Sequence, residues 1–390
     1  KNDDRNKTFG VGFKTPATDS KGKAHIMEHS VLNGSKKYRT REPFMDMASS
    51  SLQTFLNAMT YPDKTVYPVS SENDKDFFNL TDVYLDAVFN PLVTSKKEIL
   101  DQEGWHYVMD EDKITGISGV VYNEMKGALT DPDEIVYDDY ISYLYKNSPY
   151  QYQSGGDPAE IYKLDFKEFK NFYESHYHPS NSYIYFYGDL DIDFYLEHLD
   201  KEYLSHYDYK DLDFDIEVPD NHYDKVIESS YPASVENEDS DYLVYGFLTK
   251  KDADTKYYLT TLVLLSALFH MDSSKIRNRI YEEIAPDDFS ARVGYGVRNS
   301  IILQAQRTNK SKLDKFVEII EEGLKEASEG INKEALKSAF SIFEYGQRDQ
   351  LISVMRGLSY FLMWSFEKPI FESFNIIDYL DELRKLIDTD

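Results

Sequence analysis

The chain contains no cysteine among its 390 residues. This absence excludes disulfide bonds, thiolate nucleophiles and zinc sites built from cysteine. Any transition-metal site must therefore use histidine, aspartate or glutamate side chains. The absence does not indicate a cellular compartment, because cytosolic and secreted proteins can both lack cysteine.

Positive charge is scarce as well. The 43 lysine and arginine residues stand against 70 aspartate and glutamate residues, which gives a formal net charge of −27. Nucleic-acid binding needs a basic footprint, so we expect no nucleic-acid partner. The acidic balance either attracts a basic peptide or only keeps the chain soluble.

Long apolar runs are also missing. No run reaches the ~18 residues that a membrane helix requires, and the richest window, residues 257–269, predicts a buried helix. We therefore expect no membrane partner. The sequence begins at Lys1 and shows no readable targeting segment. The location therefore stays open; we favour the cytoplasm, with an organelle matrix as the alternative for a eukaryotic protein.

Several common catalytic and binding motifs are absent too. The sequence has no G-x-S-x-G segment and no P-loop, and the GGDP segment at residues 155–158 predicts a turn followed by a helix start. The acidic segment at residues 131–134 (DPDE) could suggest calcium, but its spacing is not that of an EF-hand. We favour a solvated loop there.

The segment from His25 to His29 (HIMEH) reads H-x-x-E-H. If it is helical, the two histidines share one face, with Cβ atoms roughly 5–6 Å apart. Two Zn–N bonds of about 2.0–2.1 Å can bridge that separation. Glu28 borders the same face and can hold a water on the metal without ligating it. The motif is the inverse of the H-E-x-x-H order of zincins and is itself known from metallopeptidases. The alternative is a helix face with two solvated histidines.

A catalytic zinc site normally takes three protein ligands and a water. By local context the best third candidate is Glu124, because it follows a predicted strand at residues 119–122 at the point where a helix begins. His176 and His178, in a predicted loop beside Pro179, are the alternatives. With three ligands in place, Glu28 would accept the proton of a zinc-bound water and pass it to the leaving amine.

Apolar periodicity predicts an α+β fold with two related α/β-sandwich domains, each an antiparallel-rich sheet covered by helices. In the first half the predicted strands are 8–15, 51–60, 64–69 and 183–187, and the predicted helices are 23–34, 74–89 and 163–177. In the second half the predicted strands are 226–231, 242–249, 290–297 and 301–307. The predicted helices there are 256–270, 274–283 and 312–388, the last one broken near Gly330, Gly357 and Pro369. A stretch rich in Asp and Tyr predicts a domain at 1–207, a linker at 208–222 and a second domain at 223–390.

Further segments accompany the H-x-x-E-H motif: 25–38 (HIMEHSVLNGSKKY), 42–44 (EPF), 54–62 (TFLNAMTYP), 82–91 (DVYLDAVFNP), 103–107 (EGWHY), 119–127 (GVVYNEMKG), 154–158 (SGGDP) and 177–181 (YHPSN). Together they resemble the inverzincin family of pitrilysin and insulinase-type peptidases (M16), in the branch that holds presequence protease and falcilysin. Beyond about residue 220 the resemblance is weaker and rests on residues 274–280 and 341–358. It implies a LuxS/M16-like metallopeptidase fold and cleavage of short unstructured peptides.

The resemblance also implies roles by position. The implied zinc ligands are His25, His29 and Glu124, and the implied base is Glu28. The implied substrate-pairing sheet edge consists of Leu56, Asn57, Ala58 and Thr60. Full-length members of the branch carry four such domains and this chain supplies about two. The family's Arg/Tyr pair, which helps bind substrate, has no counterpart in the sequence. A C-terminal half, in the same polypeptide or in a partner chain, is therefore the implied partner.

Two functions are compatible with this sequence. The first is a zinc-dependent metalloendopeptidase, or its catalytic half, acting on short unstructured peptides. The second is a non-catalytic peptide-binding or assembly subunit of the same fold. The intact set of three ligands and one base favours the first, because a subunit without a catalytic role need not keep all four residues.

Overall fold

The computed structural model describes residues 3–40, 43–217, 219–223, 225–232, 239–251, 253–294, 296–350, 358 and 376–388. The described residues divide into two compact units. Unit 1 contains residues up to 134 and residues 147–217, and unit 2 contains residues 135–146 together with the described residues from 219 to 350 and 376–388. The domain boundaries at 207 and 222 stay a prediction.

Unit 1 is built on a five-stranded antiparallel sheet, in the order β2-β4-β1-β7, with β3 also paired to β4. The strands are β1 (Lys7–Lys14), β2 (Gln53–Leu56), β3 (Met59–Thr60), β4 (Lys64–Ser71) and β7 (Ser182–Tyr187). The predicted strand at 51–60 is thus two short strands. Within the described residues β2 and β3 pair only with β4, so they form one edge of this sheet.

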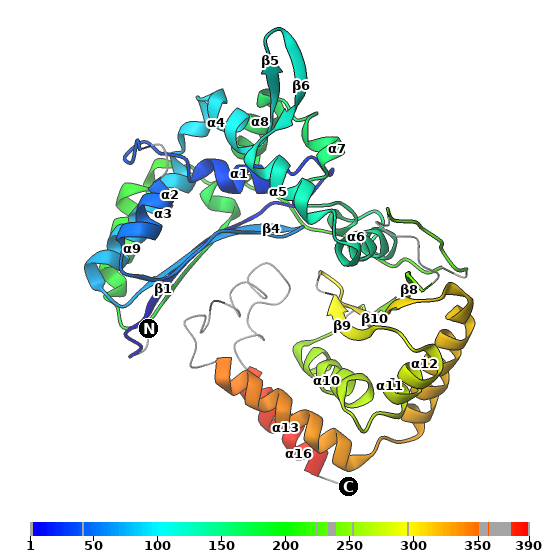
Figure 1. Ribbon diagram of the computed structural model, residues 1–390. Helices are drawn as coiled ribbons and strands as arrows, with labels where there is room; N and C mark the ends of the chain where they lie inside the picture. The colour runs from blue at the N-terminus through cyan, green and yellow to red at the C-terminus, as the bar shows by residue number, and fades with distance from the viewer. Residues whose placement is uncertain are drawn as a thin grey trace. The chain divides into compact units, whose positions relative to one another are not determined.

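Helices cover this sheet, and Figure 1 shows α1, α3 and α9 over one of its faces. The helices of unit 1 are α1 (Lys23–Val31), α2 (Pro43–Ser50), α3 (Asp74–Phe89), α4 (Lys97–Glu103), α5 (Val120–Ala128), α7 (Pro158–Ile161), α8 (Phe166–His176) and α9 (Ile192–Glu202). The core joins β1 to α1 and α3 through fully buried side chains such as Phe9, Met27 and Tyr84. Burial of each such side chain contributes about 1.5–3 kcal/mol, which fixes α1 against the sheet.

A buried carboxylate on α3, that of Asp82, forms hydrogen bonds with residues of the loop after α1. Asp82 accepts hydrogen bonds at 2.6 Å from Tyr203, 2.7 Å from Tyr38, 2.8 Å from His198 and 3.1 Å from Lys37. Burial disfavours the charged form of this carboxylate, but the four hydrogen bonds outweigh burial and lower the pKa of Asp82 below its ordinary value. The charged carboxylate therefore stabilises the folded chain.

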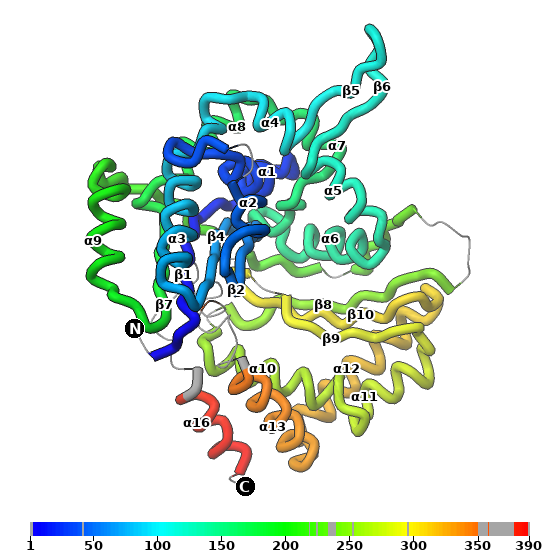
Figure 2. Tube along the Cα trace, turned by 60° about the vertical axis from the view of Figure 1, so that its left-hand side comes forward, coloured from blue at the N-terminus to red at the C-terminus, as the bar shows by residue number. Residues whose placement is uncertain are grey.

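The segment before Glu124 differs from its prediction. β5 (His106–Asp110) and β6 (Lys113–Ser118) form an antiparallel hairpin that projects from the helices (Figure 2). The predicted strand at 119–122 is wrong, because α5 already begins at Val120. Val121 and Met125, one helical turn apart, are both buried against the core. This tertiary packing outweighs the local strand preference of the two valines.

Unit 2 holds a three-stranded antiparallel sheet in the order β8-β10-β9. Its strands are β8 (Asp241–Leu248), β9 (Asp288–Gly294) and β10 (Ser300–Thr308). Its helices are α6 (Pro132–Leu144), most of which belongs to this unit, α10 (Thr255–Leu265), α11 (Lys275–Arg279), α12 (Leu313–Glu329), α13 (Lys333–Gln350) and α16 (Ile376–Asp388). The break predicted near Gly330 separates α12 from α13, whereas those near Gly357 and Pro369 lie outside the described residues.

The predicted strand at 226–231 is wrong, because these residues form no strand. Val226 and Ile227 are exposed there, so the apolar pattern has no sheet partner to pack against. In both units an antiparallel sheet is nevertheless covered by helices, which confirms the predicted α+β class. No helix within the described residues is long and apolar enough to span a membrane.

Candidate metal centre

Helix α1 carries the H-x-x-E-H motif, and the residue directly before it, at the N-cap position, is a glycine. Gly22 adopts a left-handed conformation with φ of 68° and has no side chain with which to cap the helix. A Cβ at this position would lie 2.8 Å from the carbonyl oxygen of Gly155. Only glycine permits this approach without strain, so the turn at residues 153–156 lies directly against the start of the motif helix.

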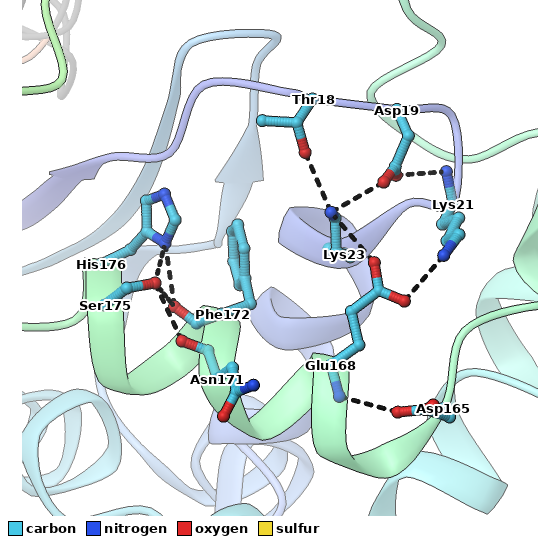
Figure 3. A network of polar contacts seen from close by, with 10 residues as sticks. All are labelled: Thr18, Asp19, Lys21, Lys23, Asp165, Glu168, Asn171, Phe172, Ser175 and His176. Carbon is cyan, nitrogen blue, oxygen red and sulfur yellow. Dashed lines mark hydrogen bonds and ion pairs between the residues drawn. The ribbon is translucent and has the colours of Figure 1, made fainter.

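Lysines around the first turn of α1 attach it to α8 (Figure 3). Lys23 Nζ lies 2.8 Å from Asp19 Oδ2 and 3.3 Å from Glu168 Oε1. Lys21 Nζ lies 2.7 Å from the other carboxylate oxygen of Glu168. Glu168 belongs to α8, so this network fixes the start of the motif helix to a second helix.

Three side chains that could hold a metal converge beside α1. His25 and His29 lie one turn apart with ring centroids 5.0 Å from each other. Glu124 projects from α5 so that one carboxylate oxygen is 3.7 Å from His25 Nε2 and the other is 3.9 Å from His29 Nε2. Among the described residues, this trio is the group whose ligand atoms all lie within 4.8 Å of one another.

The donor set fits zinc. Two ligand atoms on one tetrahedral zinc ion lie roughly 3.3–3.4 Å apart when each bond is about 2.0–2.1 Å. The nitrogen–oxygen separations of 3.7 and 3.9 Å are close to this value. Two imidazoles and one carboxylate are a ligand set typical of catalytic zinc, which keeps a fourth position for water.

Partners of the other ring nitrogens orient both imidazoles. His25 Nδ1 is 2.9 Å from the carbonyl oxygen of Gly155, which selects the tautomer with a proton on Nδ1. His29 Nδ1 is 3.5 Å from Oε2 of Glu103, a residue that is only 5 % exposed. Both Nε2 atoms are thereby left for a metal, and such partners raise the basicity of the imidazole. Neither Glu103 nor Gly155 was assigned a role from the sequence, although both lie in segments that resemble the family.

Electrostatics at the site favour a cation. Burial lowers the pKa of His29, but the hydrogen bond with Glu103 and the nearby carboxylates outweigh burial and raise this pKa above its ordinary value. A site that stabilises positive charge on an imidazole also stabilises a bound divalent cation.

Glu28 lies on the same helix but not among the converging ligand atoms. It is 8 % exposed, and its Oε2 accepts a hydrogen bond of 2.6 Å from the Thr60 hydroxyl. Burial raises the pKa of Glu28, and the hydrogen bond from Thr60 and the two imidazoles offset part of that rise. A carboxylate with a raised pKa beside a metal site is suited to accept a proton.

The predicted substrate edge lies on β2, β3 and the residues between them. Leu56 ends β2, Asn57 and Ala58 connect the strands, and Thr60 ends β3. The Asn57 carbonyl accepts a hydrogen bond of 3.1 Å from the buried Tyr84 hydroxyl. At the other end of the edge, the hydrogen bond from Thr60 to Glu28 connects β3 to α1.

The alternative ligands lie elsewhere. His176 is stacked between Phe172 and Phe214, with ring centroids 4.3 and 4.5 Å away, and burial lowers its pKa. His178 caps a short helical turn by accepting from the Ser180 backbone N–H. The acidic segment at 131–134 contributes to no group of converging metal ligands within the described residues.

Comparison with known proteins gives two family matches. Residues 8–152 match the family model described as "Insulinase (Peptidase family M16)", and residues 163–342 match the one described as "Peptidase M16 inactive domain". All three converging ligands and Glu28 lie in the first of these segments.

Two relatives are similar to this chain in sequence, and one solved structure is similar to it in fold. The chain is 39 % identical over 372 residues to "Protein HypA" of Clostridium perfringens, covering 92 % of the chain and 38 % of that protein. It is 36 % identical over 410 residues to "Presequence protease 1, chloroplastic/mitochondrial" of Arabidopsis thaliana, covering 99 % of the chain and 37 % of that protein. The chain therefore spans less than two-fifths of the length of these relatives. A crystal structure of a protease from Helicobacter pylori shares the fold, with a TM-score of 0.69 and 15 % identity over 100 % of this chain and 89 % of that one.

Proposed function

The chain belongs to the M16 peptidase family, and on that premise we propose that it is a zinc-dependent metalloendopeptidase, or the catalytic half of one, that hydrolyses short unstructured peptides. The observation that carries this proposal is the convergence of His25, His29 and Glu124 within 4.8 Å, with the buried carboxylate of Glu28 on the same helix. Two imidazoles, a ligating carboxylate and a separate base make up the set that peptide hydrolysis on zinc requires.

The proposed mechanism divides the work among this chain's residues. His25 and His29 would hold the metal through Nε2, because their Nδ1 atoms face Gly155 and Glu103. Zinc, when held there, would supply a water with its pKa lowered towards ~7 and a Lewis acid for the scissile carbonyl. Glu28 accepts the proton of the attacking water and delivers it to the leaving amine.

In this proposal the peptide backbone pairs with the edge formed by β2 and β3. Main-chain hydrogen bonds to a sheet edge bind without reading many side chains, so we expect a broad choice of unfolded peptides. The net charge of −27 favours basic peptides at long range.

We further propose that full activity needs C-terminal M16 domains, supplied by the same polypeptide or by a partner chain. Support comes from the relatives, because the chain covers only 38 and 37 % of two of them. A cytoplasmic or organelle-matrix location stays a prediction.

The second candidate is a non-catalytic peptide-binding or assembly subunit. It is favoured by the match of residues 163–342 to a family model described as inactive. That match begins after the ligands and the base, which lie in the segment matched by the insulinase model. For this reason we place the peptidase first.

Zinc content and peptide cleavage test the proposal together. We expect one zinc per chain after dialysis, and cleavage of a quenched fluorescent peptide by the chain alone or with C-terminal M16 domains added. Replacing Glu124 by Gln should weaken zinc binding at least ~10-fold, whereas replacing the exposed Glu134 by Gln should not. A wild-type chain that binds zinc but cleaves nothing, even with the added domains, would establish the second candidate instead. Unchanged zinc affinity after replacement of Glu124 would remove this residue from the ligand set.

A further inference from the structure

Thr60 lies on the edge strand but directs its side chain into the protein. Its backbone pairs with Thr65 of β4, at the end of the short strand β3. Its hydroxyl lies 2.6 Å from Oε2 of Glu28, whose side chain is buried. A carboxylate can only accept, so the Thr60 hydroxyl is the donor, and 2.6 Å is the length of a strong charge-assisted hydrogen bond.

We propose that Thr60 is a positioning residue for the general base, in addition to any part it takes in pairing with the substrate. This inference rests on the proposed peptidase function. By donating to Oε2, the hydroxyl fixes the rotation of the Glu28 carboxylate about its last bond. Oε1 is then the oxygen left to accept the proton of the attacking water.

The protein interior, rather than a bound peptide, holds this arrangement in place. The Tyr84 hydroxyl, from the buried face of α3, donates to the carbonyl of Asn57 at 3.1 Å. Asn57 directly follows β2, and its backbone N–H also reaches the Pro68 carbonyl of β4 at 3.3 Å. The connection that leads into β3 is thus fixed before a peptide arrives, and with it the hydroxyl that orients the base.

This edge therefore has two separable tasks. In the proposed function its backbone pairs with the peptide, whereas the Thr60 side chain donates to Glu28. Loss of the backbone task should appear in KM, because it weakens the substrate and the transition state alike. Loss of the side-chain task should appear in kcat, because the orientation of a base matters only during proton transfer.

Three variants test this assignment. Thr60→Val keeps the shape and removes the hydroxyl, Thr60→Ser keeps the hydroxyl, and Thr115→Val removes an exposed hydroxyl on β6, outside the site, that donates to the Val108 carbonyl at 3.2 Å. We expect Thr60→Val to lower kcat by about 10- to 100-fold, as for a lost hydrogen bond to a charged group. KM and zinc stoichiometry should stay close to wild type, Thr60→Ser should restore most of kcat, and Thr115→Val should have no effect.

An unchanged kcat in Thr60→Val, a rise in KM alone, or a failure of Thr60→Ser to restore kcat would each overturn the assignment. A second measurement does not depend on activity. In a double-mutant cycle of Thr60→Val with Glu28→Ala, the effect of Thr60→Val on the unfolding equilibrium constant should shrink at least ~5-fold when Glu28 is absent. An inactive wild type would count against the proposed function, and the cycle would still decide whether Thr60 holds Glu28. Strictly additive effects would overturn the inference.

Discussion

Replacement of Glu103 by Gln tests whether a residue that is not itself a proposed ligand affects zinc binding at the candidate metal centre. Glu103 is 5 % exposed and its Oε2 lies 3.5 Å from Nδ1 of His29. Glutamine keeps the size of the side chain and removes its charge, so His29 loses the carboxylate that raises its basicity. Substitutions of such partners typically reduce metal affinity 10- to 100-fold, as an order of magnitude.

Because the distance between His29 Nδ1 and Glu103 Oε2 is long, we expect a loss of zinc affinity at the lower end of that range. A charge-assisted N–H···O bond is shortest and strongest at about 2.7–2.9 Å, and 3.5 Å is well beyond this. We therefore expect zinc affinity to fall about tenfold, which corresponds to ~1.4 kcal/mol. Competition with a chromophoric chelator at fixed pH and ionic strength measures this change.

The matched control is Glu98→Gln, which removes an exposed carboxylate from the same helix α4. It alters the net charge equally but should leave zinc affinity within about twofold, because solvent screens its charge. If Glu103→Gln binds zinc as tightly as wild type, Glu103 does not tune His29. If both variants lose affinity equally, the effect is one of overall charge and the reasoning from geometry is refuted.

Three further predictions concern residues that hold the elements of the candidate site in place. Asp82→Asn should destabilise the chain by about 2 kcal/mol, measured by urea unfolding. Since the pKa of Asp82 is lowered on folding, this difference should be complete above the ordinary aspartate pKa and be lost as the pH falls through the lowered pKa of the folded state; a difference that grows in acid would contradict the sign. Gly22→Ala should destabilise the chain and weaken zinc binding together, because a Cβ would lie 2.8 Å from the Gly155 carbonyl that orients His25; wild-type stability and zinc affinity would rule this out. Tyr84→Phe should raise KM for peptides about threefold or more, since it frees the backbone at the substrate edge; peptide-cleavage kinetics with an unchanged KM would refute it.

The sequence predicts much of the fold because burial leaves a periodic pattern. Helix α3 has Phe77, Leu80 and Tyr84 on its buried face, and strands β1 and β4 are almost entirely buried. All three elements match their predicted positions closely. The hairpin of β5 and β6 was not predicted, since none of its strand residues is buried and no alternation of burial marks its strands. Where packing imposes no pattern on the residues, sequence reasoning has nothing to detect.

The site follows the same rule. His25, Glu28 and His29 could be identified because one short helix holds them at a fixed spacing. Glu124 was selected for standing at the end of a strand, whereas the structure places it within α5. The roles of Glu103 and Thr60 could not be predicted. Glu103 contacts His29, which is 74 positions away in the sequence, and Thr60 contacts Glu28, which is 32 positions away. Such contacts depend on the tertiary fold and leave no local signal.

The most direct test of the account compares wild type with Glu28→Gln, each assayed for zinc content and for cleavage of a quenched fluorescent peptide, with C-terminal M16 domains added in parallel samples. Glu28 is assigned as the base and not as a ligand, so both proteins should bind one zinc per chain, and only the wild type should cleave. A variant that cleaves at the wild-type rate, or one that loses its zinc, would contradict the assignment of Glu28 as the base of a zinc peptidase.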